Sequence, residues 1–152
     1  MSAAQQQQTI NVADLDLAQL ADVKRQLEDE LNHLTNSFTQ LKQAQGKFRA
    51  CVENVKEVRP ENKGKSILIP LTNSLYVPGK LSDAENVIVD VGTGYYVKKT
   101  RQQAHQHYTQ KLSFLQTNLD ALAETITKKQ DALTLVEDIA RSKRTAPASG
   151  KS

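Results

Sequence analysis

Apolar residues recur every seven positions over a long stretch in the first third of the chain. The set that begins at Leu20 is apolar throughout and comprises Leu20, Leu27, Leu34, Leu41, Phe48 and Val55. A companion set that begins at Leu17 is interrupted by Lys24 and Gln45. Alternating spacings of three and four residues indicate a coiled-coil seam. With Asp16 and Gln19 as a capping box and Pro60 as a stop signal, the pattern predicts a helix over 16–59.

The same pattern returns in the last third of the chain. Thr100 and Gln103 repeat the capping box. The apolar seam that follows is broken only at Lys129 and comprises Tyr108, Leu112, Leu115, Leu119, Leu122, Ile126, Leu133, Val136 and Ala140. We predict a helix over 100–142. Because the two helices have matching lengths, we expect an antiparallel pair in which Phe48 lies near Tyr108 and Leu20 near Ile139.

Between the helices the apolar pattern changes to that of strands. Two apolar runs flank the turn residues 72–74, and two more flank Gly92-Thr93-Gly94, where glycine supplies the positive φ of a tight turn. These runs predict two β-hairpins in series, over 66–78 and 86–98. The predicted fold class is α+β, mostly α: a long antiparallel two-helix coiled coil with two β-hairpins at one end.

The predicted strands are too apolar to stand alone. Runs such as 67–69 and 87–89 are apolar on both faces, and an isolated hairpin is marginal in water. Unpaired apolar edges are also templates for aggregation. We therefore predict that the hairpins join a β-barrel or sheet shared between subunits. The predicted assembly residues are Ile67, Ile69, Leu71, Leu75, Val77, Val87, Val89, Val91 and Tyr96.

The other end of the helical pair carries more apolar residues than a two-helix seam needs. These candidate tip residues are Leu15, Leu17, Leu20, Val23, Leu133, Leu135, Val136 and Ile139. One interpretation is packing at the helix ends, including a hydrophobic staple between Leu15 and Leu20. The other interpretation is a contact surface for apolar, non-native polypeptide segments.

Composition and charge narrow the class of protein. The chain is 38% hydrophobic but only 5% aromatic, which favours long helices over an aromatic-filled enzyme core. Its net charge is +3, yet four cations and no acid lie in 141–152, so residues 1–140 carry −1. A basic nucleic-acid surface spread over the fold is therefore not expected. No apolar run reaches membrane-spanning length and the start lacks a signal peptide's apolar centre, so we expect a soluble intracellular protein without membrane contact.

The ends and the candidate chemical motifs suggest no catalysis. We expect a disordered Gln-rich start over 1–14, one domain over 15–141 and a disordered basic tail over 143–152. Gly64-Lys65-Ser66 lacks the earlier glycine of a phosphate loop, and Gly92-Thr93-Gly94 lacks the rest of a dinucleotide motif. His105 and His107 point to different sides of one helix, and Cys51 is single. We expect no enzyme activity, catalytic residue, cofactor or metal.

The two hairpin segments resemble those of a known family. Ile69 to Leu81 is similar to the first hairpin of the prefoldin family, and Val89 to Val97 is similar to its second. The order helix, two hairpins, helix resembles the α-type prefoldin subunits. The resemblance covers about residues 10–141 and is strongest over 66–100. Ala18 departs from it, since relatives often have proline there.

The resemblance implies a function. Prefoldins are ATP-independent holdase chaperones built as hexamers of two α-type and four β-type subunits. Their coiled-coil tips capture nascent or unfolded actin, tubulin and other chains and pass them to the cytosolic group II chaperonin. The resemblance also implies a cytoplasmic location and leaves a nuclear role open. The alternative hypothesis is a coiled-coil adaptor that docks one defined folded partner and binds no general clients.

Overall fold

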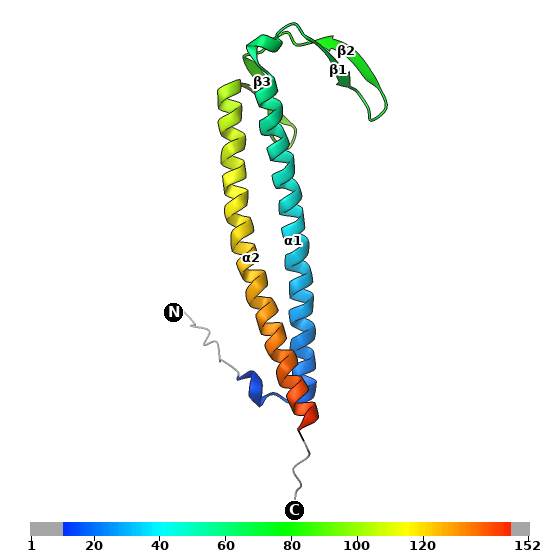
Figure 1. The fold of residues 1–152 in the computed structure, drawn as a ribbon, viewed down its shortest axis with the longest axis vertical. Coiled ribbons are helices and arrows are strands. Elements are labelled where there is room, and N and C mark those ends of the chain that lie inside the picture. Colours follow the sequence, from blue (N-terminus) through cyan, green and yellow to red (C-terminus); the bar gives the residue numbers. More distant parts are fainter. Residues whose placement is uncertain (1–10, 147–152) are drawn as a thin grey trace, which may run out of the picture. The chain divides into compact units, whose positions relative to one another are not determined.

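The computed structural model describes residues 11–146, and Figure 1 shows its elements. Along the chain, two β-hairpins lie between two long helices. In full, the elements are 3-10 helix η1 (Val12–Asp14), α1 (Leu17–Glu57), 3-10 helix η2 (Pro60–Asn62), β1 (Ser66–Pro70), β2 (Tyr76–Lys80), β3 (Asn86–Gly92), β4 (Tyr95–Thr100) and α2 (Arg101–Thr145). This is the predicted mostly helical α+β fold.

Both helices begin at the predicted capping boxes. The Gln19 N–H donates to Asp16 Oδ1 at 2.7 Å, and the Asp16 N–H donates to Gln19 Oε1 at 3.0 Å. Thr100 and Gln103 form the same reciprocal pair at 3.1 and 3.2 Å. Each box satisfies N–H groups that the first turn of a helix leaves without an intrahelical partner. The two helix starts are therefore set by local sequence.

Several element bounds differ from the sequence-based expectation. α1 is shorter than 16–59, α2 ends at Thr145 rather than 142, and the hairpins extend to Lys80 and Thr100. Within the segments expected to be disordered, residues 12–14 form η1 and residues 143–145 are helical. The Ala13 N–H donates to Asn11 Oδ1 at 3.1 Å, which gives η1 a local cap. The expectation for 1–10 and 147–152 concerns residues outside the described range.

The described chain divides into two compact units. We call residues 11–39 with 120–146 the helical unit, and residues 40–119 the hairpin unit. In the helical unit, Leu20 of α1 and Val136 of α2 follow the predicted coiled-coil pattern, and both are buried. Lys24 Nζ lies 2.9 Å from Glu137 Oε1, and Lys129 Nζ lies 2.5 Å from Glu30 Oε2. The antiparallel pairing within this unit therefore carries two interhelical ion pairs.

The hairpin unit has its own antiparallel helix pair. The Phe48 and Tyr108 rings lie 6.0 Å apart between centroids, as predicted. Gln45 is 3% exposed and its Nε2 donates to Gln116 Oε1 at 2.7 Å. The Arg101 guanidinium donates to the Val58 carbonyl oxygen at 2.7 Å and so ties the start of α2 to the end of α1.

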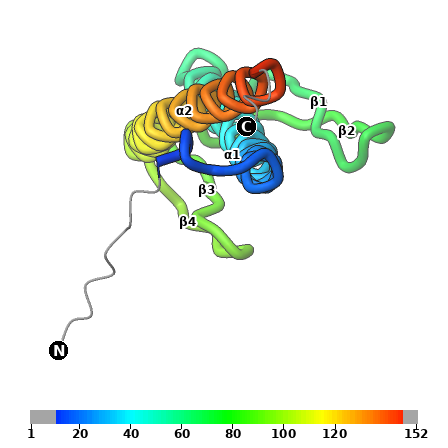
Figure 2. The backbone as a smooth tube through the Cα atoms, turned by 90° about the horizontal axis from the view of Figure 1, so that it is seen from below, coloured from blue at the N-terminus to red at the C-terminus, as the bar shows by residue number. Residues whose placement is uncertain are grey.

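The strands form two separate two-stranded antiparallel sheets. β1 pairs with β2 from Ser66↔Lys80 to Pro70↔Tyr76. β3 pairs with β4 from Asn86↔Thr100 to Gly92↔Tyr95, with a bulge between Asp90 and Gly92. The second turn places Gly92, Thr93 and Gly94 at positive φ, which explains the two glycines there. Figure 2 shows the two hairpins leaving the helix pair of their unit in different directions.

The two hairpins differ in how they contact the helices. β3 packs on the helices through Val89, which is 1% exposed and clusters with Val55 and Ala104, while Val87 and Tyr108 pack at the edge of this cluster. All five residues of β1 are exposed. The β1–β2 hairpin is joined to the preceding loop by hydrogen bonds from the Gly64 N–H to the Leu81 oxygen and from the Leu81 N–H to the Lys65 oxygen. Among residues 11–146, no helix is both long and apolar enough to cross a membrane.

Candidate assembly and client-binding surfaces

The hairpins carry most of the exposed large apolar side chains in the described part of the chain. Eleven of the fourteen such residues lie between 67 and 97. We call them the assembly surface: Ile67, Leu68, Ile69, Leu71, Leu75, Tyr76, Ile88, Val91, Tyr95, Tyr96 and Val97. Soluble monomers rarely expose so many large apolar residues in neighbouring segments. This surface has the character of an interface.

The structure places six of the predicted assembly residues on this surface, namely Ile67, Ile69, Leu71, Leu75, Val91 and Tyr96. Val77 is half-buried. The assignment of Val89 to assembly needs correction, because Val89 is 1% exposed and packs on the helices of its own chain, whereas Val87 is half-buried at the edge of the same cluster. Their side chains point to the inner face of β3, and residues on one strand alternate between faces.

Sequence reasoning missed five residues of the assembly surface: Leu68, Tyr76, Ile88, Tyr95 and Val97. Leu68 and Ile88 are 70% and 73% exposed, more than the residues on either side of them. The available signal was the absence of polar residues from the runs 67–69 and 87–89, which implies that both faces of each strand are apolar. The prediction took residues from one face of each strand and so left out those on the opposite face.

The predicted tip residues have three different environments. Leu17 and Leu135 are exposed, at 43% and 54%. Leu15, Val23, Leu133 and Ile139 are half-buried. Leu20 and Val136 are buried, at 1% and 3%, so neither can contact a client in the conformation described here. These two residues therefore pack within the helix pair, and the prediction that they lie on an open client surface is wrong for this conformation.

A lysine near the end of α2 holds the segment that precedes α1. Lys143 Nζ donates to the Ala13 carbonyl oxygen at 2.7 Å and also to the Leu15 carbonyl oxygen. An ammonium group that donates to two backbone oxygens makes charge-assisted hydrogen bonds, which are stronger than neutral ones. The sequence predicts Lys143 to lie in a disordered tail, because no local pattern links it to residues so far away along the chain.

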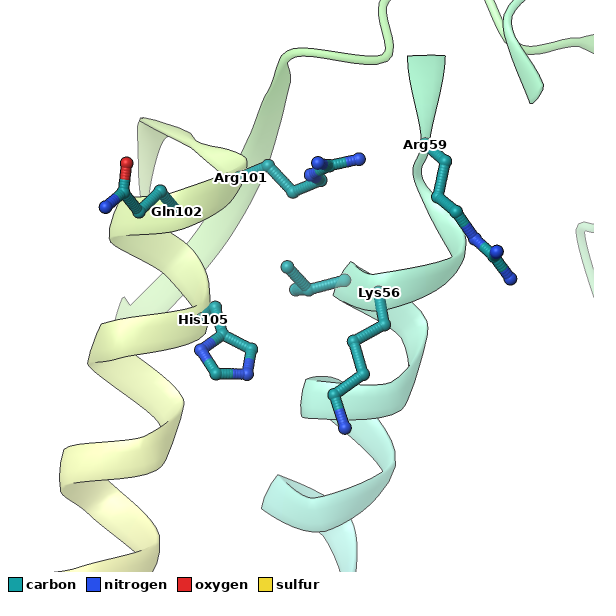
Figure 3. A pocket seen from close by; sticks show the side chains of 6 residues that line it. Lys56, Arg59, Arg101, Gln102 and His105 are labelled. Carbon is teal, nitrogen blue, oxygen red and sulfur yellow. The ribbon is translucent and has the colours of Figure 1, made fainter. Parts of the chain in front are cut away.

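A groove with basic walls lies between the end of α1 and the start of α2 (Figure 3). Its volume is about 450 Å³ and it is lined by Val55, Lys56, Arg59, Arg101, Gln102 and His105. Its cations already have partners: Lys56 pairs with Glu53 at 2.8 Å, Arg59 with Glu57 at 3.6 Å, and Arg101 with the Val58 oxygen. Only the Arg101 contact joins the two helices, and the other two cations pair with carboxylates close to them in sequence.

The remaining candidate motifs have structural roles. Lys65 Nζ donates to Asn62 Oδ1 at 2.8 Å, within the loop that leads into β1. Residues 92–94 form the tight turn between β3 and β4. Among the residues that the structure describes, no three His, Cys, Asp or Glu side chains group as metal ligands would.

The surroundings of His107 and Tyr108 shift the pKa values of both side chains. Burial, with a smaller contribution from a hydrogen bond to Cys51, raises the pKa of Tyr108. Burial lowers the pKa of His107, and the nearby Lys99 and Lys111 lower it further because each opposes a second positive charge. Both groups therefore favour their neutral forms.

A helix pair that carries two hairpins with exposed apolar surfaces defines a coiled-coil assembly protein. Residues 27–145 match the family model described as Prefoldin subunit. The chain belongs to the prefoldin family, whose members are chaperone subunits.

Known relatives match over most of the chain. It is 42% identical to the probable prefoldin subunit 5 of Schizosaccharomyces pombe, over 94% of each chain. It is 41% identical to prefoldin subunit 5 of Homo sapiens, over 80% of this chain and 79% of that protein. A filamentous prefoldin from Methanocaldococcus jannaschii, solved by cryo-electron microscopy, shares the fold at a TM-score of 0.66 and 18% identity, over 75% of this chain and 94% of that one. The predicted resemblance to the prefoldin family is thus confirmed, and these two curated relatives are both subunit 5 of prefoldin.

Proposed function

We propose that the chain is an α-type subunit of a heterohexameric, ATP-independent holdase chaperone. Its hairpins join an intersubunit β-barrel with other prefoldin subunits, two α-type and four β-type in the complete assembly. The observation that carries this proposal is the assembly surface, because each large apolar side chain moved from water into an interface gains about 1.5–3 kcal/mol. Eleven such side chains lie within two short hairpins, so association that covers them favours an obligate assembly.

The strand topology supports the same proposal. Each hairpin of the described chain pairs only with itself, so each strand has an outer edge whose N–H and C=O groups are available to a further strand. Exposed apolar edges favour strand addition. A barrel closed by hairpins of neighbouring subunits covers both the edges and the side chains.

Client binding belongs to the helical unit. Exposed Leu17 and Leu135 offer small apolar contacts, and half-buried Val23, Leu133 and Ile139 add area when the helix ends adjust. Weak contacts at several tips of one hexamer reach useful avidity and still permit release. We propose unfolded or nascent actin and tubulin as clients, transfer to the cytosolic group II chaperonin, and a cytoplasmic location with a further nuclear pool.

The test combines native mass with an aggregation assay. The chain is co-expressed with its sibling prefoldin subunits, and the purified complex is weighed by native mass spectrometry. The complex is then mixed, without ATP, with guanidine-denatured actin and with one unrelated denatured protein. We expect a hexamer that suppresses light scattering of both.

Two results would contradict the proposal. A stable, folded monomer in dilute buffer would remove the assembly role of the hairpins. Binding of one folded partner at a fixed stoichiometry, without suppression of aggregation, would instead identify a coiled-coil adaptor.

A further inference from the structure

The segment before α1 is folded against the helical unit. We call residues 11–16 the N-terminal strap. Its backbone is ordered by hydrogen bonds from the Asp14 N–H to the Asn11 oxygen at 3.0 Å and from the Leu15 N–H to the Val12 oxygen at 3.3 Å. Seen along the helices, the strap (blue) runs beside α2 and joins the start of α1 (Figure 2).

Lys143 attaches the strap to α2. Its ammonium group donates to the Ala13 and Leu15 carbonyl oxygens, which lie on either side of the end of η1. Lys143 is half-buried, so solvent weakens these bonds less than it would at a fully exposed site. This contact joins residues that lie 128 and 130 positions apart in the chain.

The strap leads into the apolar first turn of α1. Leu15 precedes the Asp16 cap, and Leu20 is the fourth residue of α1, which are the two positions of a hydrophobic staple. A seam residue in the first turn of a helix at the end of a coiled coil is normally partly exposed to solvent, yet Leu20 is 1% exposed. Val136 is similarly buried, whereas Leu17 and Leu135 remain exposed nearby.

We propose that the end of the helical unit is a binding site for a short apolar peptide segment, and that the N-terminal strap occupies this site until a client segment displaces it. This inference rests on the proposed holdase function. Displacement separates Leu15 from its staple with Leu20 and opens the helix ends, where Leu17 and Leu135 are exposed, to a client segment. The strap lowers apparent client affinity by the fraction of molecules in which it is bound.

The experiment releases the strap in the complete hexamer. Lys143→Met keeps the length of the side chain and removes its donors. Lys128→Met is the matched control, because Lys128 is an exposed lysine of the same helix that pairs only locally, with Glu124 at 2.7 Å. A third variant lacks residues 1–15, and a fourth combines this deletion with Lys143→Met. Suppression of the aggregation of guanidine-denatured actin is measured for every variant. Amide exchange of residues 11–20 is measured for the unmodified hexamer and for the two variants that retain these residues.

We expect Lys143→Met to speed exchange at Asp14 and Leu15 by about tenfold, the scale set by the loss of a charge-assisted hydrogen bond. We also expect it to raise client capture severalfold. Deletion of 1–15 should raise capture to the same degree, and Lys143→Met should add nothing to that deletion. Lys128→Met should change neither quantity.

Each contrary result is informative. Unchanged exchange in Lys143→Met would overturn the attachment of the strap. Faster exchange without greater capture, or additive effects in the combined variant, would overturn competition between strap and client. Failure of the proposed function looks different, because the unmodified hexamer would then hold no denatured actin at all.

Discussion

Polar side chains interrupt the apolar seam at three positions, and each has a partner on the opposite helix. The pairs are Lys24–Glu137, Gln45–Gln116 and Lys129–Glu30. The two ion pairs are more than a third exposed, so solvent screens them and each contributes little to stability. Gln45 is buried, and a buried polar group is costly when its partner is lost. The amide pair therefore specifies the helix register more strongly than the ion pairs do.

Replacing Gln45 with Met should test this difference. The substitution keeps the volume of the side chain but removes the donor to Gln116, so we expect local stability of the helix pair to fall by about 1–3 kcal/mol. Hydrogen exchange of the hairpin unit in the assembled complex measures the change. Gln43→Met, at an exposed position of the same helix, should have little effect. Equal effects of the two substitutions would show that the amide pair has no special role.

His107 predicts a pH dependence of stability. Its pKa in the folded chain lies below the ordinary value of 6.5, so the unfolded chain takes up a proton more readily. Stability is therefore greatest above pH 6.5 and falls as the pH drops below it towards the folded-state pKa. His107→Gln should reduce the difference in thermal midpoint between pH 7.5 and 5.5.

The matched control for this prediction is His33→Gln, because His33 is an exposed residue of the helical unit. It should leave the pH dependence as it is. A wild-type complex with the same midpoint at both pH values would contradict the role assigned to His107.

At the scale of the element, β3 presents two neighbouring residues with opposite roles. Ile88 is 73% exposed, whereas Val89 is 1% exposed and packs against Val55 and Ala104. Ile88→Glu should block assembly by placing a charge in the interface, while the hairpin keeps its contacts with the helices. Val89→Ala should lower local stability by about 1–3 kcal/mol through the cavity it leaves, with little direct effect on the interface.

Native mass spectrometry and hydrogen exchange separate these two effects. Ile88→Glu should shift mass from hexamer to smaller species with normal exchange at Ala104. Val89→Ala should retain the hexamer with faster exchange there. Loss of the hexamer only in Val89→Ala would reverse the assignment of the two faces.

Local sequence predicted the elements better than it predicted which residues they bury. Both capping boxes and both tight turns are formed by residues within a few positions of each other, so their patterns could be interpreted directly. The inner face of β3 could not be predicted in this way, because Val87, Ile88 and Val89 are all apolar. Packing against the helices determines which of them is covered. The contact of Lys143 with Ala13 likewise depends on the antiparallel pairing, which brings the two chain ends of the helical unit together.

At the scale of the whole molecule, the two units carry different parts of the proposed activity. The assembly surface lies entirely in the hairpin unit, residues 40–119. The candidate tip residues lie entirely in the helical unit, within 11–39 and 120–146. Since each unit has its own interhelical contacts, loss of the outer part of one need not unfold the other.

Removal of residues 1–24 and 134–152 should therefore separate assembly from client capture. The deletion removes seven of the eight tip residues, leaving only Leu133, and it spares every residue of the hairpin unit. When all six subunits are trimmed at equivalent positions, we expect a hexamer that no longer suppresses aggregation of denatured actin.

The shorter deletion of 1–15 makes this prediction specific. It removes the strap but leaves Leu17, Leu20 and Val23 in place, so it should increase capture where the longer deletion abolishes it. Native mass spectrometry checks that both variants remain hexameric, and light scattering measures capture. Full suppression by the trimmed hexamer would place client binding outside the helix ends, because no other part of the tip surface would then remain to account for it.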